Sequence, residues 1–378
     1  MKKSQKVIFW IMILLVGGLG GLIADRYFFP YLSSTSFFSK YDFLKRSTED
    51  VTVINKTEQV FIKEENTVNK TTGKVSSSLV KIISYQKNSS QKIQTTKEGM
   101  GAVVTSDGLI LAVSSNIDTQ KDTLYKIIFN DGARFDGEFF ATDSFSELSF
   151  IKINAANLNT VSFANSDDIK AGEKIVAFGK NHGKQFIALS SGLIKGFENS
   201  YNLSGKTISS SEKMEGVYKT DINFDSNFDG GLITDFASQV VGIVESLEKN
   251  GQIEYFAIPS NEVKKVIEKA INNQLETAPV LGIYYISLNK DYAEINNLPV
   301  TEGALIYTPS LNPGLAIIAN SAAAKAGLKL NDIITKINDQ AINANKPLSN
   351  VLYSYKKGES INITILRNSE EITKNIIL

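Results

Sequence analysis

The stretch TDINFDSNFDGGL, residues 220–232, is the most informative part of this chain of 378 residues. It ends on the pair Gly230-Gly231, and glycine reaches backbone conformations with positive φ at low cost. Asp229 stands directly before that pair. The stretch therefore predicts a tight loop that carries a carboxylate directly before its glycine pair.

Five further groups of residues accompany this loop in a fixed order. They are GMGAVV (99–104) with DGLIL (107–111), AVSSNI (112–117), DSFSELSFIKI (143–153), IVAFG (175–179) with SGLI (191–194), and VVGI (240–243) with YFAIPS (255–260). Together they resemble the HtrA family of trypsin-like serine proteases, over roughly residues 75–271. The resemblance implies a mainly β fold with the two barrels of the chymotrypsin type.

The same resemblance implies where a catalytic triad would lie. The nucleophile position holds Asp229, the general-base position holds Ser115, and the orienting carboxylate is Glu147. In such a triad serine attacks, histidine takes the proton and aspartate fixes the imidazole tautomer. Loss of the serine or the histidine costs about 10⁶ in turnover in one such enzyme. The single histidine, His182, falls in a variable loop of the family. We therefore expect no catalytic residues, and a pseudoprotease.

Three other chemistries at these positions stay open, although the sequence does not favour them. Ser115 could be a nucleophile with Glu147 as its base, but a carboxylate with a pKa of about 4 is a poor base for a hydroxyl. Glu147 and Asp229 could share a proton, which requires close, buried carboxylates. Asp225, Asp229 and Glu147 could bind a metal through oxygen, but no metal-binding spacing supports it. We favour a structural role in which Asp229 caps the loop amides.

By the same resemblance, the loop before the glycine pair is a former oxyanion loop. Ser226 and Asn227 stand where the family has proline and glycine, and Leu232 replaces a second proline. Asparagine tolerates positive φ better than most residues, so the loop can keep its outline. The former oxyanion loop consists of Asn227, Phe228, Asp229 and Gly230.

Local patterns agree with a β-rich fold. Short β-prone runs are closed by the pairs Asp107-Gly108 and Asp131-Gly132, which are typical of hairpins. The regular spacing favours antiparallel barrels or a sandwich. Residues 262–272 predict a short amphipathic helix. Its apolar face would hold Val263, Val266, Ile267 and Ala270.

Residues 280–378 resemble the PDZ domain that follows HtrA protease domains. The motifs are LGI (281–283), EGALI (302–306), SAAAKAGLKLNDII (321–334) and INDQ (337–340). The resemblance implies a groove that takes a peptide as an added strand, with its carboxylate on the backbone amides of Leu281, Gly282 and Ile283. A purely structural PDZ domain with a blocked groove is the alternative. The apolar pocket beside these amides would be lined by Ile283, Leu348, Val351 and Leu352.

Bulk composition excludes several classes of function. The 40 basic and 40 acidic residues balance, which gives no electrostatic case for binding nucleic acid. The chain has no cysteine, so disulfides, thiolate metal sites and a cysteine nucleophile are excluded. We expect no cofactor and no metal.

The N-terminal region predicts a membrane anchor. Val7 to Ala24 is an uncharged run of 18 residues, near the lower limit for a helix that spans a bilayer. Lys2, Lys3 and Lys6 precede it, so the positive-inside rule places the N-terminus in the cytoplasm. A cleavable signal peptide is the alternative, but no small-x-small site ends the run. We expect a single-pass cell-membrane protein whose bulk is extracytoplasmic.

These observations predict five parts. They are a cytoplasmic tail (1–6), a transmembrane signal anchor (7–24), a stalk (25–72), a trypsin-like domain (73–277) and a PDZ domain (278–378). The expected function is that of a scaffold, adaptor or chaperone that binds unfolded or C-terminal peptide segments. An active HtrA-type serine endopeptidase in protein quality control is the first alternative, and a structural subunit of HtrA-like oligomers is the second. The resemblance also implies a homotrimer.

Overall fold

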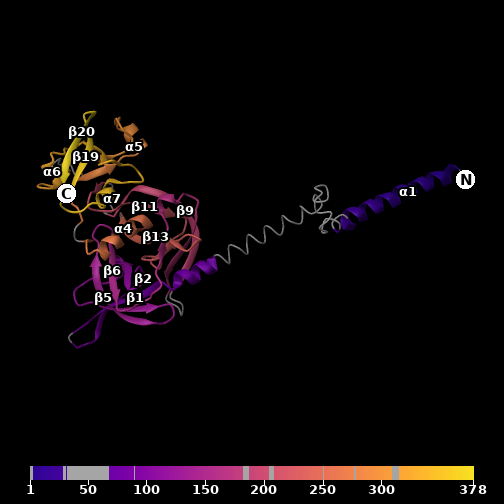
Figure 1. The fold of residues 1–378 in the computed structure, drawn as a ribbon, viewed down its shortest axis with the longest axis horizontal. Coiled ribbons are helices and arrows are strands. Elements are labelled where there is room, and N and C mark those ends of the chain that lie inside the picture. Colours follow the sequence, from indigo (N-terminus) through magenta and orange to yellow (C-terminus); the bar gives the residue numbers. More distant parts are fainter. Residues whose placement is uncertain are drawn as a thin grey trace. The chain divides into compact units, whose positions relative to one another are not determined.

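The computed structural model describes residues 3–28, 31, 68–88, 90–181, 187–203, 208–249, 251–275, 278–308 and 315–378 (Figure 1). The chain divides into two units, Met1–Asn69 and Lys70–Leu378. His182 and most of the predicted stalk lie outside the described residues.

The first unit contains the long helix α1 (Lys3–Ile23), which continues as a π-helical turn over Ala24–Phe28. Its apolar side chains from Phe9 to Ile23 are exposed. In the described ranges, no helix reaches the combination of length and apolar character that crossing a membrane requires. The membrane anchor therefore stays a prediction.

The first barrel of the second unit is a closed ring of antiparallel strands in the order β1-β2-β3-β6-β5-β4. Burial alternates along the strand of residues 124–129, as the pleat requires, so that Tyr125, Ile127 and Phe129 are all buried. The six strands are β1 (Leu79–Lys87), β2 (Ile93–Val103), β3 (Leu109–Val113), β4 (Leu124–Phe129), β5 (Arg134–Thr142) and β6 (Leu148–Ile153).

Both predicted Asp-Gly hairpins are present in this barrel. Gly108 joins β2 to β3 with φ +97°, and Gly132 joins β4 to β5 with φ +91°. A Cβ on Gly108 would lie 2.6 Å from the carbonyl oxygen of Ile153. Glycine is therefore required there both by the backbone conformation and by the neighbouring strand.

The second barrel runs β12-β8-β9-β11-β14-β13 and closes because β12 also pairs with β13. β7 adds to β13 in parallel. The mainly β, two-barrel architecture predicted from the sequence is thereby confirmed. The strands are β7 (Ser162–Phe163), β8 (Lys174–Lys180), β9 (Ile187–Asn202), β11 (Glu215–Thr220), β12 (Leu232–Thr234), β13 (Gln239–Lys249) and β14 (Gln252–Pro259).

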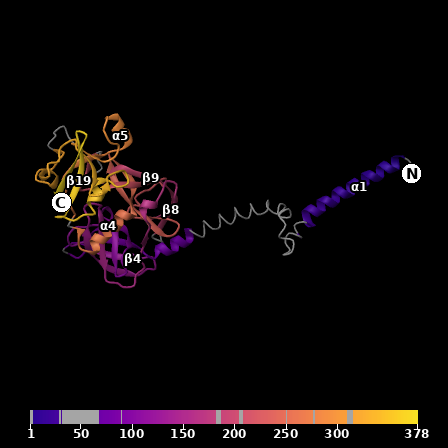
Figure 2. The same ribbon diagram turned by 45° about the horizontal axis from the view of Figure 1, so that its top comes forward.

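The predicted amphipathic helix is α4 (Ser260–Ile271). This helix, orange in Figures 1 and 2, packs against β13, β14 and β7 of the second barrel. The four apolar residues expected on its inner face are all buried, as the helical period requires. They are Val263, Val266, Ile267 and Ala270.

The C-terminal domain is built on a sheet ordered β10-β15-β16-β17-β19-β20, with β18 paired to β17. β10 precedes the second-barrel strand β11 in the chain, so a segment of the protease-like region extends the C-terminal sheet. Its strands are β10 (Ser209–Ser210), β15 (Tyr284–Ser287), β16 (Ala304–Ile306), β17 (Ile333–Ile337), β18 (Gln340–Ala341), β19 (Ser360–Arg367) and β20 (Glu370–Ile377). Its helices are α5 (Lys290–Ile295), α6 (Ala322–Lys325) and α7 (Leu348–Leu352).

Candidate functional site

Ser115 and Asp229 come together at the junction of the two barrels, as the motif positions predict. Ser115 lies in a 3-10 turn (Ser114–Asn116) directly after β3, and Asp229 lies in the loop before β12. The Ser115 hydroxyl donates a hydrogen bond of 3.2 Å to Oδ2 of Asp229. Asp229 is buried. The two positions that would hold base and nucleophile therefore hold a hydroxyl and a carboxylate bonded to each other.

Glu147, at the third triad position, faces a different partner. It forms an ion pair with Lys213, which also donates a hydrogen bond of 2.8 Å to the carbonyl oxygen of Ser144. Its backbone is strained, with φ +57°, in a region that non-glycine residues rarely occupy. Its carbonyl oxygen accepts a 2.9 Å bond from the amide of Ser114, one residue before Ser115. Glu147 thus helps to position the turn of Ser115, while its carboxylate is neutralised by Lys213.

Glu245, a third acidic side chain of this site, was not predicted from the sequence. It lies on β13, is 4% exposed, and its Oε2 atom has no hydrogen-bond partner in the described structure. Burial raises its pKa well above the ordinary glutamate value, and the negative charges of Asp229 and Glu147 raise it further. Burial also raises the pKa of Asp229, and hydrogen bonds from Ser246 and Ser115 partly oppose that rise. A glutamate inside the apolar run VVGIVES was the available signal.

Two amides of the former oxyanion loop, those of Asn227 and Phe228, are bonded to Asp225. The amide of Asn227 donates a 2.8 Å hydrogen bond to the carboxylate of Asp225, and the amide of Phe228 donates one of 3.0 Å to the carbonyl oxygen of Asp225. The expectation that Asp229 would cap these amides is therefore wrong for both. Gly230 has φ +74°, and a Cβ there would lie 2.5 Å from the side-chain nitrogen Nδ2 of Asn116. The loop keeps a tight turn at Gly230, while the carboxylate of Asp225 accepts the hydrogen bond that the Asn227 amide would otherwise offer to an oxyanion.

This arrangement supports none of the replacement chemistries that the sequence left open. Ser115 donates to Asp229 rather than to Glu147, so Glu147 is not placed to act as the base for its hydroxyl. Asp229 and Glu147 are bonded to different partners, which argues against a shared proton between them. Across the described ranges, no three acidic or histidine side chains are arranged to hold a metal ion. Asp225, Asp229 and Glu147 therefore do not form such a group.

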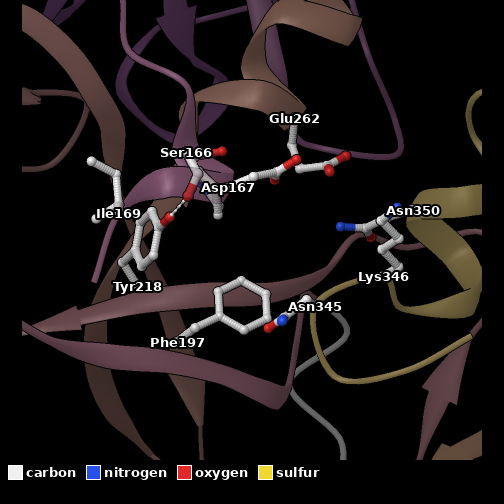
Figure 3. A pocket seen from close by; sticks show the side chains of 10 residues that line it. Ser166, Asp167, Ile169, Phe197, Tyr218, Glu262, Asn345, Lys346 and Asn350 are labelled. Carbon is white, nitrogen blue, oxygen red and sulfur yellow. Dashed lines mark hydrogen bonds between the residues drawn. The ribbon is translucent and has the colours of Figure 1, made fainter. Parts of the chain in front are cut away.

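A separate pocket of about 280 Å³ lies between the second barrel and the C-terminal domain (Figure 3). Asp167 and Glu262 line one side of it, and Lys346 and Asn350 line another. The Tyr218 hydroxyl bonds to the carbonyl oxygen of Ser166 beside it. This pocket contains none of the three triad positions, so it is not the remnant of the protease active site. The other lining residues are Ile169, Phe197, Pro259 and Asn345.

The predicted carboxylate-binding loop of the C-terminal domain is formed but occupied. The amide of Gly282 donates a 2.9 Å hydrogen bond to Oε1 of Glu212, and the amide of Ile283 donates one of 3.1 Å to the hydroxyl of Ser211. Leu281 is buried, and its carbonyl oxygen accepts from Ala323 at 3.0 Å. The residues expected to line the neighbouring pocket share one core cluster: Ile283, Leu348, Val351 and Leu352. The groove therefore holds a segment of its own chain, as in the blocked-groove alternative.

Comparison with protein families supports both domains. Residues 99–243 match the trypsin-like peptidase domain, and residues 279–378 match the PDZ domain. The chain is 27% identical over 403 residues to the serine protease Do-like HtrA of Lactococcus lactis subsp. cremoris (strain MG1363), covering 97% of this chain and 94% of that relative. It is 28% identical over 306 residues to the protein of the same name from Bacillus subtilis (strain 168), covering 78% and 66%.

The periplasmic serine endoprotease DegP of Escherichia coli (strain K12) is 27% identical over 285 residues, which cover 74% of this chain and 56% of DegP. Among solved structures, the HtrA-type protease AlgW with a tripeptide matches with a TM-score of 0.63. That match covers 81% of this chain and 95% of the AlgW chain at 20% identity, and it shows the shared fold.

A trypsin-like peptidase fold followed by a PDZ domain defines the class of this protein. The similarity to HtrA proteins extends across both domains.

Proposed function

We propose that this chain is a catalytically inactive HtrA-type protein that binds unfolded or C-terminal peptide segments as a scaffold, adaptor or chaperone. One observation carries the proposal. Ser115 and Asp229 hydrogen-bond to each other at the positions where a serine protease needs a histidine and a serine. Without a histidine and a serine at these positions, neither proton abstraction nor attack on a carbonyl can take place by the triad mechanism.

Activity measurements on residues 70–378 test this proposal directly. The protein should leave unfolded casein intact and should not react with a fluorophosphonate probe, while an active HtrA protease assayed beside it does both. Labelling that disappears in Ser115→Ala would overturn the proposal, because it would identify an activated serine. Casein cleavage with the same dependence would favour an active serine endopeptidase instead.

The proposal also includes membrane anchoring through the N-terminal helix. Support comes from the uncharged run Val7 to Ala24 and from the three lysines that precede it. Protease added to intact spheroplasts should digest the C-terminal domains and leave a short N-terminal fragment that a tag at residue 1 reports. Full protection until lysis would contradict this topology.

A further inference from the structure

A short strand from the protease-like region lies against the C-terminal domain as a peptide ligand would. β10 pairs antiparallel with β15, with Ser209 opposite Tyr285 and Ser210 opposite Tyr284. The pairing continues with a 3.2 Å bond from the amide of Ser211 to the carbonyl oxygen of Ile283. Addition of a strand at a sheet edge is the way in which PDZ domains take their ligands.

Glu212 follows this strand and places a carboxylate on the loop that would receive a peptide terminus. Its Oε1 atom accepts the Gly282 amide at 2.9 Å, and its Oε2 atom accepts the Ser210 hydroxyl at 2.8 Å. Gly282 has φ +80°, and a Cβ there would come within 2.3 Å of Ser321. The loop is therefore shaped around a glycine whose amide points at an anionic oxygen.

The far end of the segment is fixed on the opposite side of the groove. The amide of Glu215 donates a 3.0 Å bond to the side-chain oxygen of Asn350 on α7, and the Asn350 side-chain amide returns a 2.8 Å bond to the Glu215 carbonyl oxygen. The Glu215 carboxylate accepts the Tyr285 hydroxyl at 2.7 Å. Residues 209–215 thus bond to both β15 and α7.

The same segment reaches the former triad. Lys213, directly after Glu212, forms the ion pair with Glu147. The amide of Met214 donates a 3.1 Å bond to the carbonyl oxygen of Phe145. Two consecutive side chains therefore face two different sites. Glu212 faces the carboxylate-binding loop of the PDZ domain, and Lys213 faces Glu147 at the third triad position.

We propose that residues 209–215 are an internal ligand of the PDZ groove, in which Glu212 replaces the terminal carboxylate of a peptide. A C-terminal peptide with a free carboxylate binds only by displacing this segment, and its binding releases Lys213 from Glu147. This inference rests on the proposed peptide-binding function and adds that the groove is closed at rest.

Peptide titration tests the competition. Fluorescein-labelled heptapeptides ending in valine, leucine or phenylalanine, each as free acid and as amide, are titrated into residues 70–378. Glu212→Gln removes the negative charge but keeps an oxygen acceptor, and Glu212→Ala removes both. Loss of one charge-assisted hydrogen bond from the internal ligand should tighten free-acid binding by about 10- to 150-fold over the unsubstituted protein. Glu248→Gln, at an exposed glutamate of β13, should leave the affinity unchanged.

Hydrogen exchange gives a readout that needs no added peptide. Amides of residues 209–215 and of Gly282 and Ile283 should exchange faster in Glu212→Gln than in the unsubstituted protein or in Glu248→Gln. If exchange is faster in Glu212→Gln but no peptide binds to any of the proteins, the proposal of an internal ligand is supported and the proposed peptide-binding function is rejected. Equal affinity and equal exchange in all three proteins would overturn the internal ligand, and peptide binding by all three would leave the proposed function standing.

Discussion

The hydroxyl of Tyr353 donates a 2.9 Å hydrogen bond to Oδ1 of Asp143, and this bond joins the PDZ domain to the first barrel. Both residues are buried, and the ring of Tyr353 stacks on Phe145 at 4.2 Å between centroids. The other oxygen of Asp143 accepts two bonds from Ser146, 2.9 Å from its amide and 2.6 Å from its hydroxyl. Lys269 of α4 lies 4.5 Å above the same ring. One aromatic side chain therefore connects both domains and the helix between them.

Replacing Tyr353 with phenylalanine should reveal how much this bond contributes. The ring and its stacking stay, but Asp143 keeps a buried carboxylate oxygen without a donor, which costs roughly 1–3 kcal/mol, or more for a charged group. Chemical denaturation of residues 70–378 should report that loss in the free energy of unfolding. Tyr355→Phe serves as the matched control, because the Tyr355 hydroxyl accepts a hydrogen bond from the exposed side chain of Asn338. Equal stability of both variants would contradict the interpretation.

The sequence predicted those parts of the site that follow from motif position. Ser115 and Asp229 meet because the turn after β3 and the loop before β12 occupy fixed places in a two-barrel fold. Glu245 was not predicted, since a single acidic residue in an apolar run does not reveal which side chain it faces. Glu212 was not predicted either, because its polar surroundings are typical of a loop. Its partner, Gly282, lies 70 residues further along the chain, and only tertiary structure brings them together.

Restoring the nucleophile alone should not restore activity. Asp229→Ser supplies a hydroxyl, but Ser115 cannot act as its general base, and the amide of Asn227 stays bonded to Asp225. A serine without a base, in a loop whose oxyanion donor is occupied, lacks two of the components of the mechanism. Fluorophosphonate labelling and casein cleavage by this variant should stay at background. Labelling at residue 229 would show that the site retains more of the protease machinery than its hydrogen bonds indicate.

Asp229→Asn should stabilise the protein at neutral and alkaline pH. Burial raises the folded-state pKa of Asp229, so the folded protein binds its proton more tightly than the unfolded chain does. The contribution of Asp229 to the free energy of unfolding is therefore lost as the pH rises from the pKa of the unfolded state, about 4, through the pKa of the folded state. Asparagine carries no such charge and also removes the repulsion on Glu245. Melting temperatures at pH 8 should favour the variant, and the difference should shrink toward pH 4. A difference that is independent of pH would contradict this account.

Glu215 should make the segment of residues 209–215 sensitive to pH. Burial raises its pKa to about 7, and hydrogen bonds from Tyr285 and Ser209 oppose part of that rise. An unfolded glutamate titrates at about 4.3, so between these pH values the folded state holds a proton that the unfolded state has lost. The free energy of unfolding then falls as the pH rises, by about 1.4 kcal/mol per unit and about 4 kcal/mol in total, and changes little above pH 7.

The variant Glu215→Gln separates this contribution from those of the other buried carboxyls. Its amide oxygen can still accept the Tyr285 hydroxyl, and it does not titrate. Urea unfolding of residues 70–378 from pH 4.5 to 8 should show a steeper fall in stability for the unsubstituted protein than for this variant. Glu371→Gln, at an exposed position on β20, should follow the unsubstituted protein throughout. Parallel curves for all three proteins would show that Glu215 is already ionised at the lower pH, and that its burial between β15 and α7 does not hold a proton on it.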